Sequence, residues 1–110
     1  MFRLTPNAEI VGTSVEDYIS ISPAKLKQLF GEPERGDGYK MSGIYVFQDW
    51  EDNMITLYDW KCTDLYDQGH PSPEDFWNDT KDAYFHVGSI KKETARRFVN
   101  ILQEICNLKG

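Results

Sequence analysis

The chain has little cysteine, few basic side chains relative to acidic ones, and no long hydrophobic run. Its 110 residues include only Cys62 and Cys106 as cysteines, too few for a disulfide framework, so we expect reduced thiols. No stretch approaches the roughly 18 apolar residues of a membrane span, and Met1–Thr5 does not open a signal peptide. We therefore expect a cytoplasmic protein of a single domain, residues 1–110.

Acidic residues outnumber basic ones, 18 to 12, and the excess is unevenly placed. Residues 49–82 hold ten acids against two bases, whereas residues 83–110 hold two acids against five bases. A net charge of -6 opposes contact with a phosphate backbone, so we do not expect nucleic-acid binding. The acidic segment is either a solvated loop region or a surface that attracts a basic partner.

The centre of the chain, residues 43–60, predicts two strands joined by the polar turn 49–53. Apolar and aromatic residues alternate there with a period of two, which is typical of strands. A third strand is predicted at 83–87, ended by Gly88. One face of this hairpin is predicted to be aromatic and is either a contact surface or a second small core. Its residues are Tyr45, Phe47, Thr56, Tyr58 and Trp60.

Two Ser-Pro pairs mark helix starts. Ser22 precedes a predicted helix at 23–30, because serine caps a helix and proline is tolerated at its first position. Ser72 precedes a shorter predicted helix that ends near residue 78. The apolar spacing of the C-terminal part predicts a final amphipathic helix at 91–108.

These elements predict an α+β fold with two layers. We expect a three- or four-stranded antiparallel sheet with helices 23–30 and 91–108 packed on one face. Residues 8–11 fit a short edge strand, and residues 15–21 fit either a strand or a short helical turn.

The long segment between the hairpin and the third strand mixes large apolar groups with acids. The apolar groups either anchor the segment to the domain or form an exposed patch for a partner. On the second interpretation the partner-binding residues are Leu65, Tyr66, Asp67, Glu74, Asp75, Phe76 and Trp77.

Asp59 and His86 are the titratable pair of interest. In an antiparallel meander they come within hydrogen-bond reach, and a histidine oriented by a carboxylate is half of a general-base device. The pair is structural, contacts a ligand, or serves a hydrolase. A ligand site would use Tyr58, Asp59, Trp60, Lys61 and His86.

Metal-binding spacing is absent from the sequence. Cys62, His70 and His86 carry suitable atoms, but no pattern such as C-x-x-C or H-x-x-x-H relates them. We therefore expect neither a metal nor a cofactor.

Several short segments together resemble a set of small, largely uncharacterised phage-encoded proteins. The segments are GTSVEDYI, KLKQLFGEP, ITLYDWK and FHVGS, within residues 12–89. They are similar to a G-T-S start, an F-G-x-P helix end, an I-Y-D-W-K strand and a W-H-I-G-G strand. Leu57, Phe85 and Ser89 depart from that pattern. The resemblance implies a phage origin, a similar fold and shared positions at Asp59, Trp60, Lys61 and His86. More loosely, the layout is similar to that of small α/β inhibitors of the β-lactamase-inhibitor type.

Three classes of function follow. The first is a non-enzymatic binding protein, a phage-encoded modulator or inhibitor of a host protein, such as a defence protein. Its partner would be a protein with a basic surface. The second is a small-ligand or nucleotide-binding, scavenging protein. The third is a small hydrolase that uses Asp59 and His86.

Overall fold

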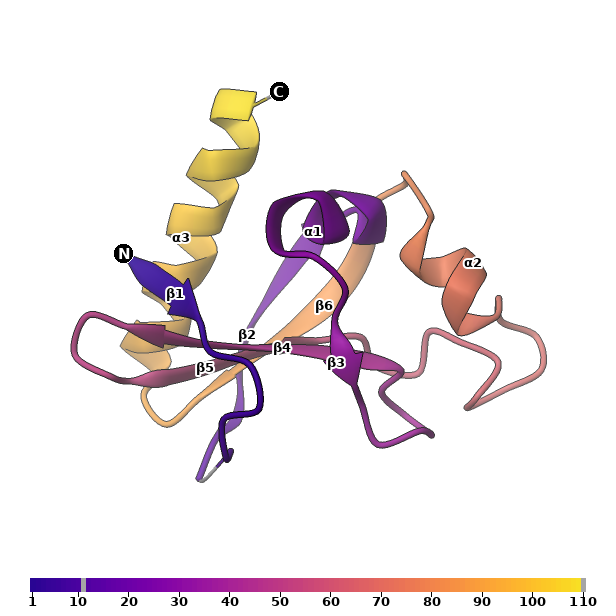
Figure 1. Cartoon of the computed structure of the whole chain (residues 1–110), viewed down its shortest axis with the longest axis horizontal. Coiled ribbons are helices and arrows are strands. Elements are labelled where there is room, and N and C mark those ends of the chain that lie inside the picture. The colour runs from indigo at the N-terminus through magenta and orange to yellow at the C-terminus, as the bar shows by residue number, and fades with distance from the viewer. Residues whose placement is uncertain (11, 110) are drawn as a thin grey trace.

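A computed structural model describes residues 1–10 and 12–109 of the chain. Over these residues the backbone forms six strands and three helices (Figure 1). The strands are β1 (Phe2–Leu4), β2 (Ser14–Ile21), β3 (Glu34–Arg35), β4 (Gly43–Asp49), β5 (Met54–Tyr58) and β6 (Ala83–Ser89). The helices are α1 (Pro23–Phe30), α2 (Pro73–Trp77) and α3 (Lys92–Lys109). Within the described residues, every helix is too short or too polar to span a lipid bilayer.

The strands form a single antiparallel sheet in the order β1-β4-β5-β6-β2, and β3 also pairs with β4. Figure 1 shows the helices on one side of this sheet. The predicted α+β class is confirmed, but the sheet is larger than the predicted three or four strands. Strands β1 and β3 have three and two residues, which is too short to show an alternating pattern.

Helix α1 has the predicted bounds because both of its ends carry local signals. The Ser22 hydroxyl accepts a hydrogen bond from the Lys25 amide at 3.0 Å, and Pro23 occupies the first turn. At the other end Gly31 has a φ of 83°, and its amide donates to the Lys27 carbonyl. Glycine adopts this positive φ without the strain that a side chain would bring.

The remaining predicted boundaries are shifted by one or two residues. Helix α2 ends at Trp77, and α3 is displaced by one residue from the predicted 91–108. The open choice at residues 15–21 is a strand. Strand β6 continues beyond Gly88, because Ser89 still pairs with Ile55 on one side and Ser14 on the other. Residues 8–10 form no strand, and position 11 lies outside the described residues.

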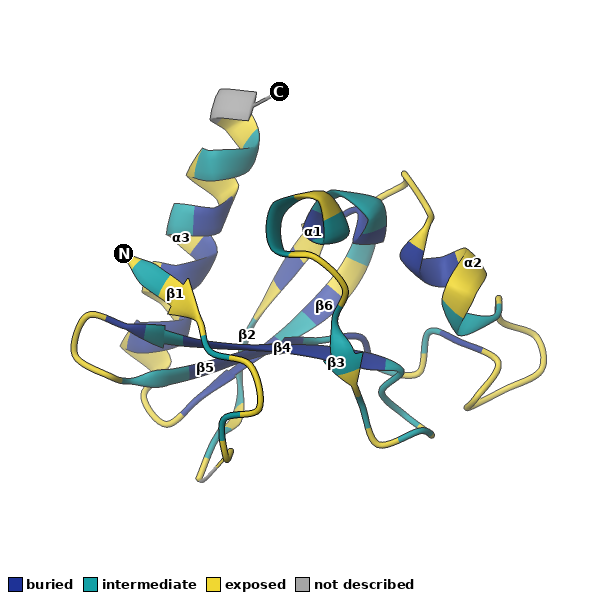
Figure 2. Ribbon diagram, in the orientation of Figure 1, coloured by how far each residue is buried: buried dark blue, intermediate teal, exposed yellow. Residues whose placement is uncertain are grey.

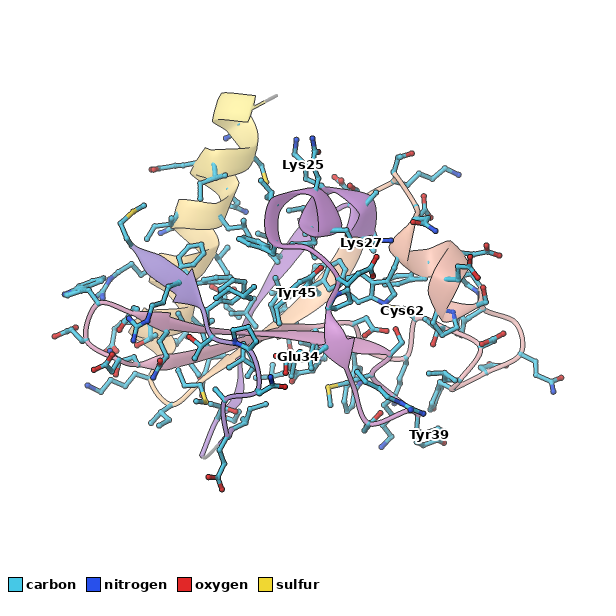
Figure 3. All side chains as sticks on the ribbon, viewed as in Figure 1. Lys25, Lys27, Glu34, Tyr39, Tyr45 and Cys62 are labelled. Carbon is cyan, nitrogen blue, oxygen red and sulfur yellow. The ribbon has the colours of Figure 1, made fainter. Side chains whose placement is uncertain are left out.

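The predicted face of the central hairpin is wrong for β4. Tyr45 pairs with Leu57 and Phe47 pairs with Ile55, so these two aromatic residues point toward the helices. The turn sets this register: the Asp49 carboxylate accepts from the amides of residues 51 and 53, both at 2.9 Å. Tyr45, labelled in Figure 3, lies between the sheet and α1.

The hydrophobic core fills the space between the sheet and the helices, and β4 is buried along most of its length (Figure 2). Edge-to-face and tilted aromatic pairs dominate it, a geometry that favours the ring quadrupoles. Its largest members are Leu26, Tyr45, Phe47, Ile55, Leu57, Phe76, Trp77, Phe85, Phe98 and Leu102.

Candidate functional site

An aromatic surface lies on the face of the sheet opposite the helices. Tyr18, His86 and Tyr58 are cross-strand partners on β2, β6 and β5, so their side chains share one face. The adjacent residues Phe85 and Leu57 point to the other face and are fully buried in the core. The sheet thus separates its core side from an aromatic side.

Five side chains form a continuous row on this face, which we call the aromatic row. Its members are Tyr18, Tyr58, Trp60, Tyr84 and His86. The rings of Tyr18 and Tyr84 stack at 5.2 Å, and His86 contacts Tyr18 edge-on at 5.0 Å. His86 also stacks on Trp60 at 5.4 Å. Tyr18 and Tyr84 are 42% and 61% exposed, so the end of the row on β2 and β6 faces solvent.

His86 holds a polar atom without a partner inside this row. Its Nδ1 is buried and makes no hydrogen bond with the described residues. Burial lowers the pKa of His86, so its imidazole is neutral at neutral pH. The neutral imidazole therefore packs as one more aromatic ring of the row, against Tyr18, Tyr58 and Trp60.

A second group of side chains adjoins the row and shares Trp60 with it. We call this group the lysine cluster: Tyr39, Lys40, Trp60, Lys61 and Tyr66. Lys40 Nζ lies 5.6 Å and Lys61 Nζ 5.9 Å from the centre of the Trp60 ring. Lys61 Nζ is also 5.1 Å from the Tyr66 ring, which lies 5.3 Å from that of Tyr39. Figure 3 shows Tyr39 on the loop before β4, on the side away from the helices.

Asp59 directly follows β5 and is fully buried on the core side of the sheet. It lies next to the first residue of β4. Its carboxylate accepts hydrogen bonds from the Ser42 amide at 2.9 Å, the Ser42 hydroxyl at 2.7 Å and the Gly43 amide at 3.0 Å. Burial raises the pKa of Asp59, although these three donors act in the opposite direction. The carboxylate ties the β3–β4 loop to the end of β5.

The predicted pairing of Asp59 with His86 does not form. Tyr58 is the cross-strand partner of His86, so Asp59, one residue later, points to the other side of the sheet. Its hydrogen bonds go to residues 42 and 43. The hydrolase hypothesis loses its general-base pair. The other four residues of the predicted ligand set, Tyr58, Trp60, Lys61 and His86, do lie together.

The predicted partner-binding residues of segment 62–82 are divided between surface and core. Phe76 and Trp77 are each 5% exposed and pack against Phe85. The Trp77 Nε1 atom donates to the Ser42 hydroxyl at 2.9 Å. These two aromatic residues therefore anchor α2. The other five are exposed: Leu65, Tyr66, Asp67, Glu74 and Asp75.

Four members of the two groups were missed in the sequence: Tyr18, Tyr39, Lys40 and Tyr84. Tyr84 alternates with Phe85 on a predicted strand, and that alternation was an available signal for an exposed ring. Tyr39 and Lys40 lie in a polar connector, and no local pattern shows that it folds back toward Trp60.

Metal ligation finds no support in the described residues, where no three His, Cys, Asp or Glu side chains come together in a metal-binding arrangement. The aromatic row and the lysine cluster instead present ring faces and ammonium groups, which suit non-covalent contact with a partner or a ligand. No protein-family model and no curated protein matches the sequence, so function is inferred from these two groups of side chains.

Proposed function

We propose that the chain is a non-enzymatic binding protein that acts by protein–protein contact through the aromatic row. The observation that carries this proposal is the stacked and exposed pair Tyr18 and Tyr84 on the face opposite the helices. Aromatic side chains dominate the energetic centres of interfaces, because they bury a large area at a small cost in conformational entropy. A pair held in a stack has already lost part of that freedom.

The acidic segment extends the proposed contact surface. Tyr66 belongs both to this segment and to the lysine cluster, and its neighbours Leu65 and Asp67 are exposed. Glu74 and Asp75 are also exposed, but they lie on α2, on the helix side of the sheet. The acidic excess of residues 49–82 supports a partner that carries a basic surface, because complementary charge accelerates encounter and selects the partner.

We further propose that the partner is a host protein and that the chain is a phage-encoded modulator or inhibitor in the host cytoplasm. This part is supported by the likeness of the segments GTSVEDYI, ITLYDWK and FHVGS to phage proteins. The likeness suggests that the partner comes from a host cell. The aromatic row is the proposed surface that contacts this partner.

The test pairs a loss-of-contact variant with a matched control. The variant Tyr18→Ala/Tyr84→Ala removes the exposed stack and leaves the core untouched. The control Trp50→Ala removes a large aromatic side chain that is 58% exposed and lies in the β4–β5 turn, outside the row. A tagged chain is used to isolate a stoichiometric host protein, whose affinity for each purified variant is then measured by calorimetry.

We expect the double variant to weaken partner binding by at least about 30-fold, which corresponds to roughly 2 kcal/mol at an interface centre. The control should stay within about threefold of the unmodified chain. Equal affinity of the double variant and the unmodified chain would remove the aromatic row from the proposal. Failure to isolate any stoichiometric protein would count against protein–protein contact itself.

A further inference from the structure

Two ammonium groups converge on one indole ring in a protein with an acidic excess. Lys40 Nζ and Lys61 Nζ both lie within 6 Å of the centre of the Trp60 ring. Among the described residues neither ammonium group makes an ion pair. An anion bound at this ring would be stabilised by both positive charges.

The backbone of the lysine cluster is held in a specific arrangement. Lys61 has a φ of 60°, an uncommon value for a residue other than glycine, and its amide donates to the Lys40 carbonyl at 2.7 Å. The Asp37 carboxylate accepts from the amides of Tyr39 and Met41 at 2.8 and 2.9 Å. These hydrogen bonds fix the loop that carries Lys40 against the residue that carries the second ammonium group.

Asp37 is an acid whose charge interacts with Lys40 of this cluster. The Met41 amide and, more weakly, the Lys40 charge lower the pKa of Asp37, so its carboxylate is ionised at neutral pH. Its hydrogen bonds are made to the backbone of its own loop. The Lys40 ammonium group feels this carboxylate but forms no ion pair with it among the described residues, so it can still meet a ligand.

A small pocket opens beside the same indole ring. It has a volume of about 170 Å³, and its lining includes Met41, Ile44, Thr56, Tyr58 and Trp60. Trp60 lines this pocket and is also the ring that the Lys40 and Lys61 ammonium groups approach, so this indole forms a rim common to the pocket and the two charges. The volume is below the roughly 300–1,000 Å³ of pockets for drug-sized ligands, which limits the occupant to about one ring system.

We propose that this rim binds a phosphorylated nucleoside. The base enters the pocket and packs against the rings of Tyr58 and Trp60, because every base offers a flat π-face for stacking. The phosphate lies between the ammonium groups of Lys40 and Lys61, which act as point charges toward it. A long nucleic-acid strand is disfavoured, because ten acids of residues 49–82 repel successive phosphates.

This inference does not depend on the proposed protein partner, and different variants test it. The variant Lys40→Met/Lys61→Met removes both charges while keeping the length of the side chains. The control Lys91→Met/Lys92→Met removes two exposed lysines near the start of α3. Binding is measured by calorimetry at low salt with each of the four nucleoside 5′-monophosphates, the corresponding nucleosides and inorganic phosphate.

We expect at least one monophosphate to bind more than tenfold tighter than its nucleoside and than inorganic phosphate. The Lys40→Met/Lys61→Met variant should bind it at least tenfold more weakly, and the Lys91→Met/Lys92→Met control within about twofold of the unmodified chain. Tyr18→Ala/Tyr84→Ala should bind it normally, which separates this site from the partner surface. Absence of binding by every monophosphate, or equal loss in both lysine variants, would overturn the inference.

Discussion

Asp59→Ala should lower the free energy of unfolding by about 3–5 kcal/mol, because it removes the acceptor of three hydrogen bonds, of which the one from Gly43 is buried and the two from Ser42 are half-buried. The carboxylate is 0% exposed and receives the two donors of Ser42 and the amide of Gly43. An alanine leaves these donors without an acceptor at the start of β4. Each unsatisfied buried donor costs about 1–3 kcal/mol. Urea unfolding followed by tryptophan fluorescence measures the loss.

A surface acid provides the matched control. Asp52 lies in the hairpin turn and forms a 2.9 Å ion pair with Arg3, in which both side chains are mostly exposed. Exposed pairs contribute about 0–1 kcal/mol, and asparagine tolerates the φ of 63° at this position, so Asp52→Asn should change the unfolding free energy by no more than that. A loss below about 1 kcal/mol for Asp59→Ala would show that water or a neighbouring group replaces the carboxylate.

The pH dependence of stability provides a second measurement for Asp59, with Asp59→Asn as the reference. Burial raises the pKa of Asp59 in the native state above its ordinary value of 3.8. The native protein then keeps a proton that the unfolded chain has released. The stabilisation from this proton is fully present below pH 3.8 and is lost as the pH rises through the native pKa. The difference in unfolding free energy between the unmodified chain and Asp59→Asn should therefore fall over that interval.

The helices were predictable because their signals are local. Ser22, Pro23 and Gly31 mark both ends of α1 within the helix and its adjacent residues. The apolar spacing of α3 predicts its length to within one residue at each end. A helix cap or an amphipathic stripe can be recognised from neighbouring residues alone, without information about distant parts of the chain.

The register of the central hairpin was not predictable in the same way. Tyr45 and Phe47 belong to an alternating pattern that is equally good with either face buried. The choice depends on the turn, where Asp52 adopts a φ of 63° and the loop closes between Asp49 and Asn53. A shift of one residue there moves every side chain of β4 to the other face.

The candidate site shows the same division between local and distant information. Trp60, Lys61 and His86 were grouped from the sequence, and they lie together. Asp59 was grouped with them, although a strand places neighbouring side chains on opposite faces. Lys40 was absent from the prediction, because its approach to Trp60 depends on a backbone contact across 21 residues of chain. Composition alone also failed to distinguish the buried Trp77 from an exposed ring.

Gly88→Ala should lower the free energy of unfolding by about 1–3 kcal/mol, because no space exists for a methyl group at this position. A Cβ atom on Gly88 would overlap the Thr56 Oγ1 atom and would lie 3.3 Å from the Ser14 carbonyl oxygen. Gly88 pairs with residues on both neighbouring strands, so the backbone cannot move away from one without disturbing the other. Gly69→Ala is the control, since its Cβ would meet only Asp67 Oδ1, at 3.8 Å.

A double-mutant cycle with Thr56→Ala identifies the cause of the loss. Thr56→Ala removes the overlapping oxygen, so Gly88→Ala should cost less in its presence than in the unmodified chain. The coupling between the two substitutions should be at least about 1 kcal/mol, within the range for residues in contact. Unfolding free energies of the four proteins give this value directly. Simple additivity would mean that the strain arises at the Ser14 carbonyl, and an unchanged stability of Gly88→Ala would contradict the close packing of β2, β5 and β6 at this point.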